Sequence, residues 1–171
     1  LGPLAESVED SGGVVFVPAF TGLGSPWWDP WARGTIIGLT RGTGRAELAR
    51  AVVEAMAFQT RDVVEAMVEA GAQPLTELKV DGGAAIMDLL LKLQADQLGV
   101  PVTRSATTET TALGAAFFAG LAEKLWSSTD ELAGLWRGDP TVEPATDRRA
   151  AEVSYRRWLE AVKRSRGWAP D

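Results

Sequence analysis

The 171-residue chain contains no cysteine, no histidine and no asparagine. Without cysteine and histidine it can form no disulfide, no thiolate or imidazole zinc site, and no nucleophilic triad built on either residue. Long apolar runs are also missing, because the longest covers residues 112–121, well short of the roughly 18 residues that a membrane helix needs. No basic leader opens the sequence, so we expect no signal peptide. With no cysteine to stabilise an extracellular fold, we expect a cytoplasmic protein.

Basic residues are outnumbered, with 17 Lys and Arg against 23 Asp and Glu and a formal net charge of −6. This balance argues against a nucleic-acid-binding surface, which needs a basic stripe. Hydrophobic residues make up 46% of the chain, which is typical of a globular domain with its own core. The chain opens at Leu1 with a short polar lead, so we expect it to be part of a longer polypeptide.

Hydrophobic patterning predicts an α/β fold. The helix over 45–70 should bury an apolar face and pair Arg50 with Glu54 at i, i+4. A proline-containing linker, 139–145, is expected before the last helix. Few strands are present, so the sheet would be thin, as in a piece of a larger domain. Strands are expected at 14–18, 35–39, 77–81 and 100–104, helices at 45–70, 86–98, 112–124, 129–136 and 146–167, and the apolar face of the first long helix at Leu48, Ala51, Val52, Ala55, Met56, Val63, Ala66, Met67 and Ala70.

The segment Leu78–Gly99 combines a strand, the adjacent glycines Gly82 and Gly83, and a helix. Glycine has no Cβ to hold a ligand away, so this arrangement lets backbone approach a phosphate or a ribose. The same pair of glycines also makes an ordinary tight turn, and the residues alone favour that interpretation. Asp81 fits a structural role in which it bonds the N–H groups of the turn, although a place near a metal-bound phosphate is the alternative.

The loop over 19–34 has no hydrophobic period and contains Trp27, Trp28 and Trp31. Three tryptophans in one loop usually serve packing or an interface, while stacking against a sugar or base is the alternative. Asp29 and Arg33 are placed to pair or to orient a ligand. No P-loop motif is present, and the Gly42-Thr43-Gly44 start of a dinucleotide fingerprint lacks its third glycine.

The residues over 34–54, GTIIGLTRGTGRAELARAVVE, resemble the C-terminal signature of the FGGY carbohydrate kinases. Gly34, Ile36, Gly38 and Leu39 are followed, after seven intervening residues, by Glu47-Leu48 and the AVVE stretch that ends at Glu54. The likeness covers nearly the whole chain and is strongest to the glycerol-phosphorylating members of the family. The other segments that carry it are FVPAFTGLGSPWWDPWARG, MAFQTRDVVEAM, LKVDGGAA, LQADQLGVPV, TALGAAFFAGLA and WLEAVKRSRGW.

The resemblance implies an actin-like ATPase fold, in which two ribonuclease-H-like domains close on ATP and a polyol. Residues 1–171 would be the C-terminal FGGY kinase domain, an incomplete nucleotide-side portion of a two-domain chain. The family implies ATP with Mg²⁺, glycerol as substrate, and a homodimer or homotetramer. We expect no nucleic-acid partner and no membrane association. The alternatives are another sugar kinase of the xylulokinase type, or a non-catalytic fragment that serves as an interaction module.

The resemblance also implies which residues act. Gly82, Gly83 and Ala84 match the motif that lies against the nucleotide, and Met87 stands where the family usually carries an asparagine. A thioether cannot donate a hydrogen bond, so we expect a weakened nucleotide contact there.

Thr111, Ala112 and Gly114 match the connecting helix at the hinge between the two domains. No catalytic residue and no metal ligand is expected within this chain, because the family's catalytic aspartate, polyol-binding residues and phosphate loops lie upstream. The chain alone should therefore be inactive.

Overall fold

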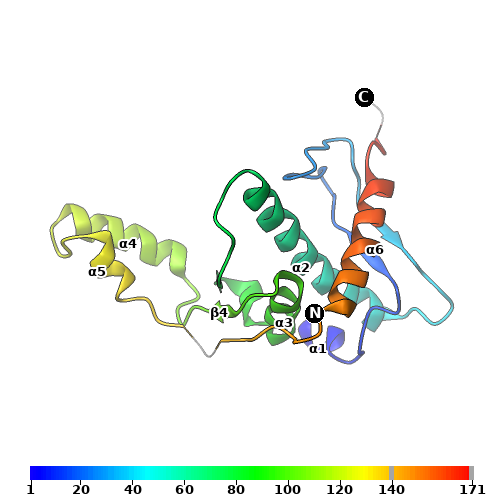
Figure 1. The fold of residues 1–171 in the computed structure, drawn as a ribbon, viewed down its shortest axis with the longest axis horizontal. Helices are drawn as coiled ribbons and strands as arrows, with labels where there is room; N and C mark the ends of the chain where they lie inside the picture. The colour runs from blue at the N-terminus through cyan, green and yellow to red at the C-terminus, as the bar shows by residue number, and fades with distance from the viewer. Residues whose placement is uncertain (139–140, 170–171) are drawn as a thin grey trace.

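The computed structural model describes residues 1–138 and 141–169. Most elements form one body, from which two helices extend as an arm (Figure 1). None of the helices in the described ranges is long and apolar enough to cross a membrane. The elements are α1 (Gly2–Ala5), β1 (Val15–Val17), β2 (Thr35–Ile37), α2 (Arg45–Glu69), β3 (Leu78–Val80), η1 (Gly83–Ile86, a 3₁₀ helix), α3 (Asp88–Leu98), β4 (Val102–Arg104), α4 (Thr110–Ala122), α5 (Thr129–Ala133) and α6 (Arg149–Ser165).

The strands form two separate two-stranded sheets. β1 and β2 are antiparallel, with Phe16 opposite Ile36. β3 and β4 are parallel, with Leu78 opposite Val102. The other edge of β4 exchanges hydrogen bonds with Val142, which lies in the predicted linker, whereas residues 139 and 140 of that linker lie outside the described residues. Two-stranded sheets are marginal by themselves, so both depend on the helices packed against them.

α2 is the central helix, and it contacts α1, α3, β1 and α6. Its predicted range is confirmed within a residue. The main core cluster surrounds Trp158, which is completely buried and stacks on Phe58 with 5.5 Å between ring centroids. The predicted apolar face is wrong in the second half of α2, because Val63 and Met67 are exposed. Arg61 and Asp62 are buried there instead.

The arm consists of α4 and α5 and projects from the sheet formed by β3 and β4 (Figure 1). α4 is apolar on all sides, yet Gly120 is its only buried residue. Trp126 packs so closely on Gly120 that a Cβ there would lie 2.1 Å from the indole ring. Phe118 remains 76% exposed. The described residues therefore bury little of this helix.

Candidate functional site

The glycine turn, residues 81–87, joins β3 to α3. Gly82 has φ +82° and ψ −180°, a backbone conformation that is open essentially to glycine alone. Gly83 then begins the 3₁₀ helix η1, and Asp88 begins α3. Gly82 is therefore required by the course of the backbone, whatever else the turn does.

Gly83 is not explained in this way. Its φ is not positive, and a Cβ built on it would meet no atom within 4 Å. Gly83 and its neighbour Ala84 are both exposed. Neither backbone strain nor packing within the described residues requires glycine at position 83. Because glycine has no Cβ, a glycine at this open position would let a ligand approach the backbone closely.

The hydrogen bonds within the glycine turn use its carbonyl groups and leave N–H groups at its start. The carbonyls of Gly82 and Ala84 accept from the N–H groups of Ala85 and Met87, at 3.1 and 3.2 Å. The N–H groups of Gly83 and Ala84 lie at the start of η1, where a helix leaves its first donors without an internal acceptor. The turn therefore offers hydrogen-bond donors at its glycine end.

Met87 lies at the end of the turn and is half-buried. Its Cγ and Sδ lie 3.5 and 3.7 Å from where a Cβ on Gly2 would stand. The side chain packs against a cluster from α1, α2 and α3 that includes Val53 and Leu90. Its exposed neighbours are Ile86 and Asp88. A contact between residue 87 and a nucleotide stays a prediction.

The predicted hinge residues lie in the helix whose first residue contacts the glycine turn. Thr111, Ala112 and Gly114 occupy the first turns of α4, and Thr111 and Ala112 are exposed. The hydroxyl of Thr110, the first residue of α4, donates a hydrogen bond to the Asp81 carboxylate. Asp81 was expected to bond the N–H groups of its own turn, and this hydrogen bond instead ties it to α4. This hydrogen bond joins the start of α4 to the residue that precedes Gly82.

Arg104, at the end of β4, was not singled out from the sequence. Its Nη1 donates to the carbonyls of Ala85 and Ile86, at 3.2 and 3.5 Å, and to Asp88 Oδ1 at 2.9 Å. Two of its partners are backbone carbonyls, which leave no mark in a sequence. The only available signal was a basic residue at the carboxyl end of a strand that pairs with β3.

In the tryptophan loop (residues 19–34), Trp27 packs against the core cluster around Trp158, while Trp31 is 43% exposed. Trp27 Nε1 donates to Asp62 Oδ2 at 3.1 Å, while Trp28 is 76% exposed. Asp29 and Arg33, which the sequence placed to pair or to orient a ligand, do not pair with each other among the described residues. Asp29 accepts instead from the N–H groups of residues 31, 32 and 167, and Arg33 donates to the carbonyls of residues 30 and 32. A carboxylate in a tight turn satisfies nearby backbone donors first, because they are already fixed around it.

Asp62 joins the loop to α2 and α6. Besides Trp27, it accepts from Trp158 Nε1 at 2.8 Å and from the Tyr155 hydroxyl at 2.6 Å. Burial raises the pKa of Asp62, and the three donated hydrogen bonds offset that increase only in part. Arg61 lies over the Tyr155 ring, 3.9 Å from its centroid. This buried network is structural and distant in sequence from the glycine turn.

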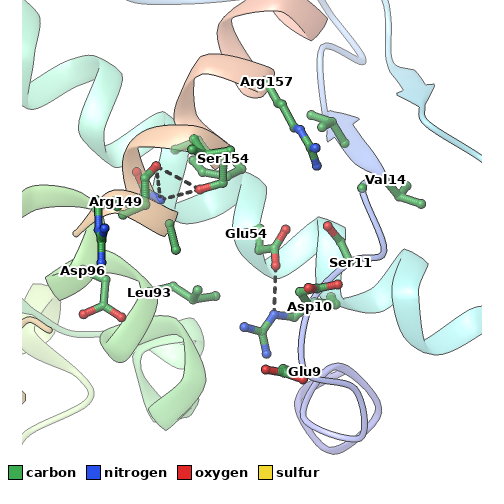
Figure 2. Close-up of a pocket in the computed structure, with 18 residues that line it drawn as sticks. Glu9, Asp10, Ser11, Val14, Glu54, Leu93, Asp96, Arg149, Ser154 and Arg157 are labelled. Carbon is green, nitrogen blue, oxygen red and sulfur yellow. Dashed lines mark hydrogen bonds and ion pairs between the residues drawn. The ribbon is translucent and has the colours of Figure 1, made fainter. Parts of the chain in front are cut away.

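A hollow of about 720 Å³ lies between the segment 9–15, α2, α3 and α6. Figure 2 shows Asp10, Ser11 and Glu54 on one side of it and Asp96 and Arg149 on the other. The predicted Arg50–Glu54 pair is confirmed at 3.0 Å, and burial raises the pKa of Glu54. None of the predicted nucleotide-binding or hinge residues lines this hollow. The glycine turn is an open surface and not part of this hollow.

Solved structures with the same arrangement of elements place the chain among proteins with the actin-like ATPase fold. The family described as the FGGY family of carbohydrate kinases, C-terminal domain, matches residues 3–123. The chain belongs to this family.

Curated relatives include a glycerol kinase of Aromatoleum aromaticum, 60% identical over 167 residues, which cover 96% of this chain and 33% of the relative. A glycerol kinase of Saccharolobus islandicus is 53% identical, with 98% and 33% covered. The chain therefore spans about a third of the length of the curated relatives it matches.

Two solved structures illustrate the structural likeness. Plasmodium falciparum glycerol kinase with ADP has a TM-score of 0.82 at 34% identity, covering 96% of this chain and 33% of that one. A ligand-bound xylulose kinase from Lactobacillus acidophilus has a TM-score of 0.79 at 26% identity, covering 92% and 32%.

Proposed function

We propose that this chain supplies part of the ATP-binding domain of an enzyme that phosphorylates glycerol to glycerol 3-phosphate, and that it is inactive alone. The observation that carries the proposal is Gly83, an exposed glycine that the fold does not require. The neighbouring Plasmodium structure is a glycerol kinase that contains ADP, and both curated relatives are glycerol kinases. Gly82, Gly83 and Ala84 would then lie against the nucleotide.

In this proposal the chain binds and orients the nucleotide and supplies no reacting group. The donors at the start of η1 face the nucleotide, and the absence of a side chain at Gly83 lets the backbone approach it. The described residues contain no group of three or more acidic side chains that could hold a metal ion. We propose that Mg²⁺ arrives bound to the ATP phosphates. Proton removal from glycerol falls to the rest of the whole protein, because phosphoryl transfer needs groups on both sides of a closed cleft.

The proposal extends to location and assembly. A net charge of −6 and no cysteine support a cytoplasmic enzyme without a nucleic-acid or membrane partner. We propose a homodimer or homotetramer, as the family resemblance implies.

One alternative is a sugar kinase, because xylulose kinases share this fold at TM-scores up to 0.80. The solved xylulose kinases are 26–30% identical to this chain. The solved glycerol kinase is 34% identical, and the curated glycerol kinases are 53–60% identical. The greater identity supports glycerol. A non-catalytic interaction module remains the other alternative, and binding of ATP by the whole protein would count against it.

Replacing Met87 by asparagine should strengthen ATP binding by the whole protein. One restored hydrogen bond is worth about 1 kcal/mol, or roughly fivefold in affinity. The change should also lower the melting temperature, because residue 87 leaves an apolar cluster. Calorimetric titration with ATP and Mg²⁺ measures the first effect and thermal unfolding the second.

The matched control is Met56→Asn, since Met56 packs against the same cluster from α2. It should lower the melting temperature without a gain in affinity. If Met87→Asn leaves affinity unchanged or lowers it, residue 87 does not reach the nucleotide.

A further inference from the structure

The connection from β4 to α4, residues 104–110, contacts the glycine turn at two points. Arg104 at its start bonds the carbonyl end of the turn, and Thr110 at its end bonds Asp81. These two contacts lie on opposite flanks of Gly82 and Gly83. A single short segment therefore holds the turn from both sides.

Arg104 satisfies groups that the backbone leaves open. The carbonyls of Ala85 and Ile86 fall at the junction of η1 and α3, where no backbone N–H in the described ranges bonds them. Arg104 Nη1 lies within hydrogen-bond distance of both. Its charge also pairs with Asp88, whose carboxylate is 83% exposed. A guanidinium presents donors in a fixed plane, so it fixes the orientation of the peptide groups that it bonds.

We propose that the β4–α4 connection positions the glycine turn for the nucleotide, with Arg104 and Thr110 as positioning residues. The inference rests on the proposed ATP-binding function. Arg104 anchors the carbonyl end of η1 to β4, and the N–H groups of residues 83 and 84 lie at the opposite end of the same 3₁₀ helix. Thr110 fixes Asp81, and with it the entry to the turn. Both residues act through the turn and do not touch the nucleotide.

The chain contains a matched control for Arg104 at the opposite end of α3. Arg148 donates from Nε to the Asp96 carbonyl at 2.9 Å and from Nη2 to the Gln97 carbonyl at 2.6 Å. Its side chain is 35% exposed, against 25% for Arg104. Both arginines therefore bond carbonyls at an end of the same helix. Only Arg104 is next to the glycine turn.

The experiment compares Arg104→Met with Arg148→Met in the whole protein. ATP is varied at saturating glycerol, glycerol at saturating ATP, and thermal unfolding is recorded for each variant. Arg104→Met should raise KM for ATP about tenfold, the effect of losing one charge-assisted hydrogen bond, with KM for glycerol unchanged. Arg148→Met should lower the melting temperature similarly and leave both KM values unchanged.

Thr110 has its own pair of variants. Thr110→Val removes the donor to Asp81 and should raise KM for ATP about threefold, as expected for one exposed hydrogen bond. Thr110→Ser keeps the hydroxyl and should restore the original value. If only the β-branched shape of residue 110 mattered, KM for ATP would be unchanged in Thr110→Val and raised in Thr110→Ser.

The inference is overturned if Arg104→Met leaves KM for ATP unchanged, or if Arg148→Met raises it equally. If Arg104→Met does not fold, Arg104→Lys is measured in its place, because lysine keeps the charge and loses the planar fork; an unchanged KM for ATP in that variant also overturns the inference. Gly83→Val distinguishes failure of the proposed ATP-binding function from failure of the positioning role of Arg104. If Gly83→Val leaves KM for ATP unchanged, the proposed function fails; if it raises KM for ATP while the arginine variant does not, only the positioning role fails.

Discussion

Replacing Gly83 by valine should sharply weaken ATP use by the whole protein while leaving the fold intact. The structure offers open space at this position, so the new side chain costs the folded chain little, within roughly 1 kcal/mol. In the nucleotide complex the same side chain would stand between backbone and ligand. Overpacking costs about 1–3 kcal/mol, which corresponds to roughly 5- to 150-fold in KM for ATP.

Gly24→Val is the matched control for this substitution. Gly24 also has no positive φ and no atom within 4 Å of a Cβ, but it lies in the tryptophan loop. It should leave KM for ATP and KM for glycerol unchanged. Steady-state kinetics and thermal unfolding of both variants test whether Gly83 faces ATP. Equal kinetics for Gly83→Val and the wild type would mean that the open glycine does not face ATP.

Replacing Asp62 by alanine should be among the most destabilising substitutions in the chain. It leaves the indole N–H groups of Trp27 and Trp158 without their acceptor, and the Tyr155 hydroxyl keeps only its second acceptor, Glu65 Oε2 at 3.1 Å. Each buried donor without a partner costs about 1–3 kcal/mol, and the two indole donors, with the weakened Tyr155 contact, should together cost about 4 kcal/mol. Chemical unfolding followed by tryptophan fluorescence measures the loss directly.

Glu160→Ala provides the comparison for a carboxylate with exposed partners. Glu160 bonds Lys163 and Arg164 on the surface of α6, and such pairs contribute at most about 1 kcal/mol. If Asp62→Ala lost no more stability than Glu160→Ala, the buried network would not anchor the tryptophan loop.

Asp62→Asn tests the charge of the same group through pH. Because burial raises the pKa of Asp62, the folded chain holds that proton more tightly than the unfolded chain does. The contribution of Asp62 to the free energy of unfolding therefore falls as pH rises from below the ordinary pKa through the raised one. Asparagine cannot ionise, so the stability of Asp62→Asn relative to wild type should increase from acid to neutral pH. A difference independent of pH would show that the pKa of Asp62 is not raised.

The sequence predicts local features of this chain better than its contacts. α2 could be placed from apolar spacing and from Gly71, which lies just beyond the helix with φ +97°. The burial of Asp62 could not, because its partners Tyr155 and Trp158 lie more than ninety residues away. Apolar periodicity treats a charged residue as exposed, and the predicted core-facing side is therefore wrong in the second half of α2.

The candidate site is also only partly predictable from the sequence. The adjacent glycines are visible there, and the family resemblance is what favours a nucleotide-binding role for them over an ordinary turn. The structure adds the distinction between Gly82, which the backbone requires, and Gly83, which it does not. Arg104 was missed because two of its partners are backbone carbonyls, which leave no mark in a sequence. Asp81 was assigned to its own turn because a short-range partner is the default for an aspartate before glycine.

The most direct test of the central claim is a substrate panel on the whole protein. ADP release is followed with ATP and Mg²⁺ in the presence of glycerol, xylulose or gluconate, alongside the 171-residue chain alone. We predict turnover of glycerol by the whole protein and none by the chain alone. Phosphorylation of xylulose or gluconate but not glycerol, or turnover by the chain alone, would contradict the account.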